Sequence, residues 1–366
     1  MLRTTGRRAI TATAALALTF TMAACGAANE SGGSGGGGED AVSGAIKGAG
    51  ASTQEKAQAE WAAKFSETSP DATVEYSPDG SGTGREKFIN GAVQFAGSDA
   101  AMDDKEIAAA KKSGCTGETI QFPVYVAPIA VTYNVKGVDE LNLSPDTIAK
   151  IFDQKITKWN DPAIKKENPD ADLPSTTITP VNRSDESGTT ENFTAYLDEA
   201  APDSWSHGAT EVWPVKGGEA AKGTSGVVST IESGNGTIGY ADAAQIGDLD
   251  AAKVKVGDEY VEYTPEAAAD ALEGAERVEP DSKTNYAVEL DRGDVEDGAY
   301  PIVLVSYAIA CSDYKDPAAA ETVKAYLEYA TSEQGQKDAS KAAGNAPLGK
   351  DGLQNAATAL KQIKTD

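Results

Sequence analysis

The sequence predicts an α/β fold with open mixed sheets flanked by helices. Short apolar runs rich in β-branched and aromatic residues alternate along the chain with amphipathic stretches of helical spacing, and this alternation is typical of α/β architecture. The length of the chain is a second observation, and it bears on the number of domains. From about Gly44 to the C-terminus the chain has ordinary globular composition and enough residues for two domains.

The predicted strands are short, with one exception. They cover residues 72–77, 119–134, 177–182, 236–242 and 300–310. The predicted helices cover residues 52–68, 84–93, 103–114, 144–152, 190–200 and 316–339. The run 119–134 is long enough to leave one domain and enter the next, and 300–310 is placed to return.

The N-terminus predicts export. A basic start is followed by an uncharged, largely apolar run at residues 9–24, which is short for a bilayer span and typical of a signal peptide. The run ends in "MAAC", which resembles the lipobox at which bacterial lipoproteins are cleaved and acylated on cysteine, although methionine stands where leucine is usual. We therefore expect a signal peptide at 1–25 with Cys25 as the lipid anchor. The alternative is an ordinary signal peptide with an incidental cysteine.

Residues 26–43 follow as a glycine- and serine-rich segment, which predicts a flexible tether. Stable retention at a membrane takes more than one acyl chain, for example palmitate, on the anchoring cysteine. We expect the protein on the outer face of the cytoplasmic membrane, as a monomer.

The chain is strongly acidic, with 32 Lys and Arg against 57 Asp and Glu and a formal net charge of −25. This argues against nucleic acid as a partner, because phosphate backbones are bound by basic surfaces. An anion site in such a protein must bind through local contacts, since the long-range field repels anions.

Cysteine and histidine usage limits the chemistry. Cys115 and Cys311 are the cysteines that remain after Cys25, and in an exported protein they predict one disulfide, with two buried thiols as the alternative. His207 is the single histidine. Isolated cysteines and one histidine predict no metal site and no cofactor.

Three predicted strand-to-helix junctions share a pattern. At 48–61, 76–89 and 182–193, glycine and serine or threonine stand just before a helix. A hydroxyl there is able to cap the helix, and the unpaired N–H groups and dipole of the first turn favour an anion. The alternative is three ordinary N-caps. No G-x-x-x-x-G-K-[ST] phosphate loop is present, and "GSGTGR" does not have dinucleotide-binding spacing.

The motifs "GAGAS", "DGSGTG", "FAGSDAAM", "IFDQKITKWNDPAI", "RSDESGTTENFTAYL" and "GTIGYAD" occur in this order. Together they resemble the periplasmic phosphate-binding proteins of the high-affinity phosphate (Pst) ABC transporters, over nearly all of the chain from Gly44. The resemblance implies a two-lobed, type II periplasmic-binding-protein fold with phosphate in the cleft between the lobes. Lobe I is expected at 44–125 plus about 300–366, and lobe II at about 126–299.

The resemblance also implies a ligand set, carried over residue by residue. It comprises Ser52, Thr53, Ser81, Asp99, Arg183, Ser187, Gly188 and Thr189. Ser52 replaces the family's threonine, and Thr53 replaces a phenylalanine that contributes a backbone N–H. Glu186 replaces a glycine, which puts the local backbone conformation in doubt. Asp185 is expected to support the site by pairing with Arg183.

The family pattern makes Asp99 the selectivity element. Phosphate near neutral pH keeps at least one proton, whereas sulfate keeps none. A buried carboxylate accepts a hydrogen bond from that proton but opposes the lone pairs of sulfate, and unpaired buried groups of this kind are costly. The implied partners are inorganic phosphate, the membrane permease subunits of a phosphate ABC transporter, and the membrane itself through Cys25.

Three other functions are weighed against this one. A binding protein for another tetrahedral oxyanion, such as sulfate or molybdate, is disfavoured by Asp99. A secreted phosphatase or hydrolase is disfavoured because the sequence has no G-x-S-x-G elbow and no metal cluster to activate water. A purely structural surface lipoprotein would need no ligand set. The sequence therefore predicts a binding protein, not an enzyme.

Overall fold

A computed structural model of the chain describes residues 42–272, 275–293, 295–296 and 298–365. The predicted signal peptide, the lipid anchor at Cys25 and almost all of the predicted linker lie outside the described residues. Within the described part, no helix is long and apolar enough to cross a membrane.

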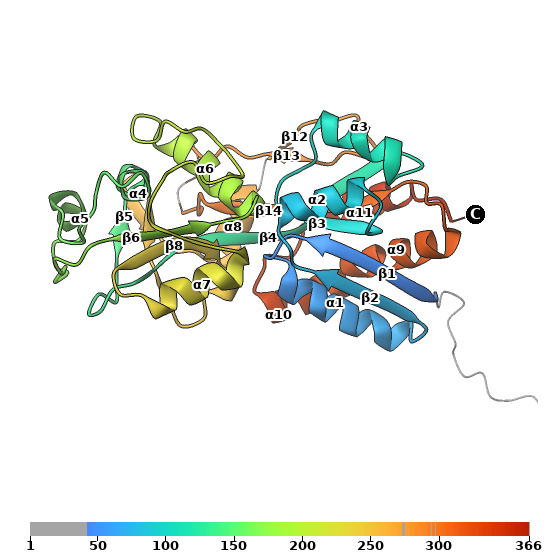
Figure 1. The fold of residues 1–366 in the computed structure, drawn as a ribbon, viewed down its shortest axis with the longest axis horizontal. Coiled ribbons are helices and arrows are strands. Elements are labelled where there is room, and N and C mark those ends of the chain that lie inside the picture. The colour runs from blue at the N-terminus through green and yellow to red at the C-terminus, as the bar shows by residue number, and fades with distance from the viewer. Residues whose placement is uncertain (1–41, 273–274, 294, 297, 366) are drawn as a thin grey trace, which may run out of the picture. The chain divides into compact units, whose positions relative to one another are not determined.

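A nine-stranded mixed sheet organises the described residues (Figure 1). Its strands run in the order β2-β1-β3-β14-β4-β8-β6-β7, and β9 pairs with β4 beside this path. The strands are β1 (Gly44–Gly50), β2 (Ala72–Ser77), β3 (Phe95–Ser98), β4 (Thr119–Asn134), β6 (Thr179–Arg183), β7 (Glu219–Ala221), β8 (Thr237–Asp242), β9 (Asp250–Ala251) and β14 (Val303–Cys311).

The long strand β4 joins the two halves of this sheet. Residues 119–128 of β4 pair with β14, and residues 129–134 pair with β8, both antiparallel. Strands β1, β2 and β3 are parallel to one another, and so are β6, β7 and β8. We call β1, β2, β3 and β14 the first half of the sheet, and β6, β7 and β8 the second half. The lobe boundaries expected from the sequence stay a prediction.

Helices flank both halves, as Figure 1 shows for α1 and α2 beside β1 to β3 and for α6 and α7 beside β6 and β8. The helices are α1 (Glu55–Thr68), α2 (Ser81–Ile89), α3 (Asp104–Ser113), α4 (Pro145–Phe152), α5 (Pro162–Glu167), α6 (Gly188–Ala200), α7 (Gly223–Ser233), α8 (Pro265–Leu272), α9 (Pro317–Ala330), α10 (Glu333–Ala343) and α11 (Lys350–Leu360), with a 3₁₀ turn η1 (Ala243–Gln245). Short strands β5 (Asn142–Leu143), β10 (Lys253–Val256) and β11 (Glu259–Val261) form a second sheet, and β12 (Glu276–Arg277) pairs with β13 (Val288–Glu289).

The helix predicted at 316–339 is wrong as a single element. Helix α9 ends at Ala330, and α10 begins at Glu333 after Ser332, whose side chain caps the new helix by accepting from the backbone N–H of Gly335. A Cβ at Gly335 would lie 2.0 Å from the carbonyl oxygen of Tyr329, so the two helices meet too closely for any other residue there. The serine and glycine of "TSEQG" are therefore a helix boundary.

Strands β1 and β3 were not among the predicted strands, because their sequences are dominated by glycine and other small residues. The structure explains this composition by close packing. A Cβ at Gly48 would lie 2.2 Å from the ring of Phe95, and one at Gly50 would lie 1.8 Å from the carbonyl oxygen of Gly97. Gly50 also has φ +145°, which disfavours other residues.

The core is aromatic on both sides of β4. In the second half, the rings of Phe193 and Tyr240 stack with centroids 4.4 Å apart, and Phe152 meets Phe193 edge-on at 4.8 Å. These rings fix the hydroxyl of Tyr240, which accepts a hydrogen bond from the backbone N–H of Arg183 at 3.3 Å. The core thus reaches directly to the end of β6.

Cys115 and Cys311 form a disulfide, with their Cα atoms 5.5 Å apart. The bond joins the turn after α3 to the last residue of β14, across 196 residues of chain. The alternative of two separate thiols does not hold.

Candidate anion-binding site

The three junctions singled out in the sequence lie around one buried carboxylate, that of Asp99, which is 3% exposed just after β3. The expected hydroxyl caps are present at only one of them. Ser187 caps α6 by accepting from the backbone N–H of Thr190 at 3.2 Å. Helices α1 and α2 have Gln54 and Gly80 at their N-caps, without a side-chain capping bond. The hydroxyls beside these two helices therefore have other partners.

Asp99 gathers hydroxyl groups from distant parts of the chain. Its Oδ1 accepts from the hydroxyls of Thr53 and Ser306, both at 2.7 Å, and its Oδ2 accepts from Thr189 at 3.0 Å. Its backbone N–H donates to Ser81 Oγ at 3.1 Å. The carboxylate thus links the loop after β1, the start of α6 and strand β14, and the backbone N–H of Asp99 adds the start of α2.

Arg183, the last residue of β6, is held by Asp185. Its Nε and Nη2 donate to the two carboxylate oxygens at 2.8 and 2.5 Å, and its Nη1 donates to Thr189 Oγ1 at 3.4 Å. Burial acts to raise the pKa of Asp185, but hydrogen bonds and charge from Arg183 outweigh it and lower the pKa below its usual value. One edge of the guanidinium is thereby neutralised, and the Nη1 edge is left facing Thr189 and, beyond it, Asp99.

Gly188 begins α6 in direct contact with the backbone after β3. A Cβ at this position would lie 2.6 Å from the carbonyl carbon of Asp99 and 2.7 Å from the nitrogen of Ala100. Asn192, one turn later, donates to the backbone carbonyls of Asp99 and Gly188, both at 2.8 Å. The absence of a side chain therefore lets the N-terminus of α6 approach Asp99.

The Ser52 hydroxyl does not point to Asp99. It lies 2.9 Å from the hydroxyl of Thr224 and accepts from the Thr224 backbone N–H at 3.1 Å, at the start of α7. Gln245 of η1 donates to the carbonyls of Ser52 and Thr53 at 3.0 and 3.1 Å. The loop after β1 is therefore tied to α7, which packs against β6 and β8, and to η1, which follows β8.

Thr224, Gln245, Ser306 and Arg85 were not identified from the sequence. Thr224 had a signal, because "KGTSGVV" before α7 has the same glycine and hydroxyl pattern as the three junctions. Ser306 lies within a buried apolar strand, and no local pattern marks it.

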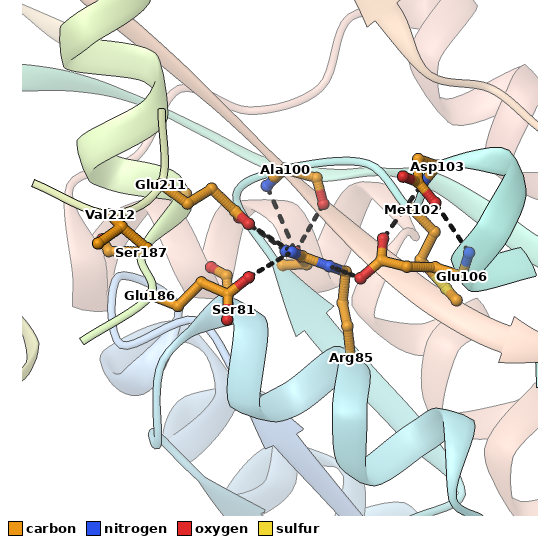
Figure 2. A network of polar contacts seen from close by, with 12 residues as sticks. Ser81, Arg85, Ala100, Met102, Asp103, Glu106, Glu186, Ser187, Glu211 and Val212 are labelled. Atoms are coloured by element: carbon orange, nitrogen blue, oxygen red, sulfur yellow. Dashed lines mark hydrogen bonds and ion pairs between the residues drawn. The ribbon is translucent and has the colours of Figure 1, made fainter. Parts of the chain in front are cut away.

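Arg85 of α2 forms a second polar cluster beside the site, shown in Figure 2. Its Nη1 and Nη2 donate to Glu211 at 2.9 and 2.6 Å, and its Nε donates to Glu106 at 2.9 Å. Glu186 lies 3.8 Å from Nη2. The side chain of Arg85 is only 4% exposed, so a buried cation joins the helix that begins at Ser81 to segments on either side of α6.

Glu186 is the residue that replaces the family's glycine. Among the described residues other than glycine, only Gln154 has a positive φ, so Glu186 stands in ordinary backbone conformation. Its carboxylate points towards Arg85 (Figure 2). The departure thus adds a charge to the Arg85 cluster and does not strain the loop.

Opposing effects act on the pKa of the Asp99 carboxyl. Burial raises the pKa of Asp99 above its usual value, against hydrogen bonds from Ser306, Thr53 and Thr189 and the charge of Arg183, which lower it. In the neighbouring cluster, burial and the charge of Glu211 raise the pKa of Glu191 to about 7. The site therefore offers many hydrogen-bond donors, one oriented cation and one buried carboxylate acceptor.

The described residues contain no group of three or more His, Cys, Asp or Glu side chains placed to hold a metal ion. His207 lies 2.8 Å from Asp153 through its Nε2. This pair joins the loop after α6 to the residue that ends α4.

Comparisons with known proteins identify the superfamily and the fold. Residues 35–334 match the model of the PBP superfamily domain. The fold is similar to that of the phosphate-binding protein from Stenotrophomonas maltophilia, with a TM-score of 0.65 at 22% identity, covering 85% of this chain and 92% of that one. A putative phosphate ABC transporter substrate-binding protein with bound phosphate, from Clostridium perfringens, gives a TM-score of 0.60 at 19% identity, covering 84% of this chain and 100% of that one. The fold and site define a periplasmic-type binding protein.

Relatives with similar sequences identify the family within this class of binding proteins. The chain is 35% identical to the phosphate-binding protein PstS 3 of Mycobacterium leprae, over 77% of this chain and 78% of that protein. It is 33% identical to the phosphate-binding protein PstS 2 of Mycobacterium tuberculosis, over 85% of this chain and 87% of that protein. The chain belongs to the PstS family of phosphate-binding proteins.

Proposed function

We propose that this chain captures inorganic phosphate at the site around Asp99 and Arg183 and delivers it to the membrane subunits of an ABC importer. The observation that carries the proposal is the buried Asp99 carboxylate, an acceptor placed among hydroxyl donors and beside an oriented guanidinium. The family membership and the phosphate-bound structures of the same fold support it.

The proposed binding mode is local. Arg183 is held by Asp185, so it supplies a charge-assisted donor at a fixed position. The hydroxyls of Thr53 and Thr189 donate to Asp99, whereas the Ser81 hydroxyl only accepts from the Asp99 backbone N–H and keeps its proton for the anion. Ser81 and the N-terminus of α6 thus supply neutral donors. Such a site holds a small anion through short hydrogen bonds, in spite of the net charge of −25.

In this proposal, Asp99 makes the site prefer phosphate over sulfate. A phosphate that keeps a proton donates it to the carboxylate, whereas sulfate presents only lone pairs. Sites built around a required hydrogen bond reject the analogue that lacks it by roughly 10⁴–10⁵ in favourable cases. The donors alone fit any tetrahedral oxyanion, so the preference for phosphate rests on this one carboxylate.

A thermal unfolding experiment tests the function. A ligand that binds only the folded state raises stability by RT ln(1 + [L]/Kd), so phosphate is expected to raise the Tm of the full-length protein in a concentration-dependent way. Sulfate at the same concentration and ionic strength is expected to leave the Tm nearly unchanged. Equal stabilisation by both anions would support a general oxyanion-binding protein instead.

The non-enzymatic role is part of the proposal. The relatives are named as binding proteins, and the described residues contain no group of His, Cys, Asp and Glu side chains placed for a metal ion that would activate water. Incubation with a chromogenic phosphate ester is expected to release no product above a matched sample of heat-unfolded protein. Steady turnover would point to a phosphatase.

We also propose that the protein acts outside the cytoplasmic membrane as a monomer anchored through Cys25. The basic start, the apolar run at 9–24 and the glycine-rich segment after the cysteine support this placement. Cys25→Ser is expected to move the protein from the membrane fraction to the soluble fraction of cell extracts. Retention of the variant in the membrane fraction would contradict a lipid anchor at this residue.

A further inference from the structure

A line of buried polar side chains runs behind Asp99. The hydroxyl of Tyr326 lies 2.7 Å from Gln58 Oε1, and Gln58 Nε2 lies 2.8 Å from Gln54 Oε1. Gln54 Nε2 then lies 2.6 Å from Ser306 Oγ, which lies 2.7 Å from Asp99 Oδ1. All five residues are at most 3% exposed. They come from α1 and its N-cap, from α9 and β14, and from the residue after β3. Together they form a chain of hydrogen bonds through the core, which we call the relay.

The direction of each hydrogen bond in this relay is fixed by one backbone carbonyl. Gln54 Nε2 also lies 3.2 Å from the carbonyl oxygen of Tyr307, which only accepts, so this atom must be the amide nitrogen. Gln54 Oε1 therefore faces Gln58, which must present its own nitrogen there. It follows that Gln58 Oε1 faces the Tyr326 hydroxyl, which donates.

The same reasoning assigns the proton of Ser306. A serine hydroxyl has one proton, and Ser306 Oγ already accepts from Gln54. Its proton is therefore committed to Asp99 Oδ1, where Thr53 places a second hydroxyl proton. Oδ1 thus accepts two hydrogen bonds from the protein, whereas Oδ2 accepts one, from Thr189, and keeps a second acceptor position.

We propose that Ser306, aligned by Gln54, is a positioning residue that holds Asp99 as a hydrogen-bond acceptor with Oδ2 turned towards the anion. The inference rests on the proposed function and deepens it, because it explains why the site requires a protonated anion. A carboxyl group that took up a proton would become a donor and would accept sulfate. Ser306 and Thr53 oppose that change by stabilising the ionised form.

Other charged or titratable groups also face Asp99 and bear on its protonation. They are Arg183 from β6, Tyr76 from β2, Tyr125 from β4 and Asp242 from β8. Arg183 favours the ionised carboxylate. Asp242 opposes it, and burial raises the pKa of Asp242 to about 7 in spite of the hydrogen bond from Tyr125. The test must therefore compare variants with the wild-type protein at each pH.

The experiment measures sulfate and phosphate binding to the full-length protein by calorimetry from about pH 5 to about pH 8. Sulfate keeps no proton in this range, so a change in its affinity reports protonation of the protein. In the wild-type protein, sulfate affinity is expected to rise as the pH falls. In Ser306→Ala the same rise is expected at higher pH, with sulfate bound roughly tenfold or more tighter at the same pH, because a hydrogen bond to a charged group is worth about one to two pKa units.

Two further variants separate positioning from packing. Ser306→Thr keeps the hydroxyl and is expected to keep the wild-type pH profile. Ser312→Ala removes a buried hydroxyl just beyond the end of β14, which accepts from the backbone N–H of Glu118 at 2.7 Å, and is also expected to keep it. If Ser306→Ala does not fold, Gln54→Met is measured instead. The rise in its sulfate affinity is expected to move to higher pH by a smaller amount.

Superimposable profiles for Ser306→Ala and the wild type would overturn the inference, and so would an equal loss of both affinities. Failure of the proposed function looks different. It would appear in the wild-type protein itself, as an absence of phosphate binding or as equal affinities for the two anions.

Discussion

Asp99→Asn is expected to remove most of the discrimination between phosphate and sulfate. The hydroxyls of Thr53 and Ser306 will hold the amide oxygen in the place of Oδ1, because both are donors. The amide nitrogen then takes the place of Oδ2 and donates where the carboxylate accepted. Sulfate gains a donor and loses a repulsive charge, while phosphate loses the acceptor for its proton.

The size of this effect is set by the selection that the carboxylate provides. The ratio of phosphate to sulfate affinity is expected to fall by up to roughly 10⁴, and competitive calorimetric titration with both anions measures it. Asp185→Asn is the matched control, since it makes the same chemical change at the carboxylate that holds Arg183. It is expected to weaken both anions by a similar factor. A phosphate-to-sulfate ratio that is unchanged in Asp99→Asn would remove Asp99 from the selection mechanism.

Arg85→Met is expected to give the largest loss of stability. Burial alone lowers the pKa of the Arg85 guanidinium, but the carboxylates of Glu211 and Glu106 outweigh it and raise the pKa. Removing the cation leaves these carboxylates, together with Glu186 and Glu191, facing one another, with Arg292 as the remaining cation that acts on Glu191. Breaking a buried ion pair in this way typically costs about 3–5 kcal/mol of unfolding free energy, which urea unfolding at about pH 8 measures.

This loss is expected to depend on pH in a defined direction. The pKa of Glu191 is raised to about 7 from an ordinary value of 4.5, so the folded state binds more protons than the unfolded state between these values. Stability therefore falls as the pH rises through this window. Arg85 acts to lower the pKa of Glu191 and of Glu186, so its removal widens the window and steepens the dependence. Part of the stability lost in Arg85→Met should return at about pH 5.5.

Arg277→Met provides the control for this pH dependence. The guanidinium of Arg277 donates to three backbone carbonyls, those of Pro280, Ser282 and Asn285. The variant is expected to lose stability to a similar extent at both pH values, because carbonyls do not titrate. A stability loss in Arg85→Met that does not change with pH would show that packing, and not the carboxylates, accounts for it.

Much of the fold was predictable from the sequence because its signals are local. The runs 72–77 and 119–134 coincide with β2 and β4, since each is a continuous apolar or alternating segment bounded by turn residues. The start of α6 was marked by the serine that caps it. The glycine-rich strands β1 and β3 lacked such signals, because close contacts with their neighbours exclude the side chains that mark a strand.

In the candidate site, too, some residues were predictable from local sequence motifs and others were not. Asp99 and the residues from Arg183 to Thr189 stand in motifs that mark them. The partners that orient them are far away in sequence: Ser306 lies 207 residues from Asp99, and Glu211 lies 126 residues from Arg85. The pairing of β14 with β3 brings Ser306 to Asp99, and the loop after α6 brings Glu211 to Arg85. A single sequence carries no local pattern for such contacts.

The central claim is that a buried carboxylate acceptor makes this site specific for a protonated tetrahedral anion. Calorimetric titration of the wild-type protein with phosphate and with sulfate at neutral pH tests it most directly. We expect saturable one-to-one binding of phosphate and sulfate affinity weaker by roughly 10⁴. Equal binding of the two anions, or binding of neither, would contradict the account.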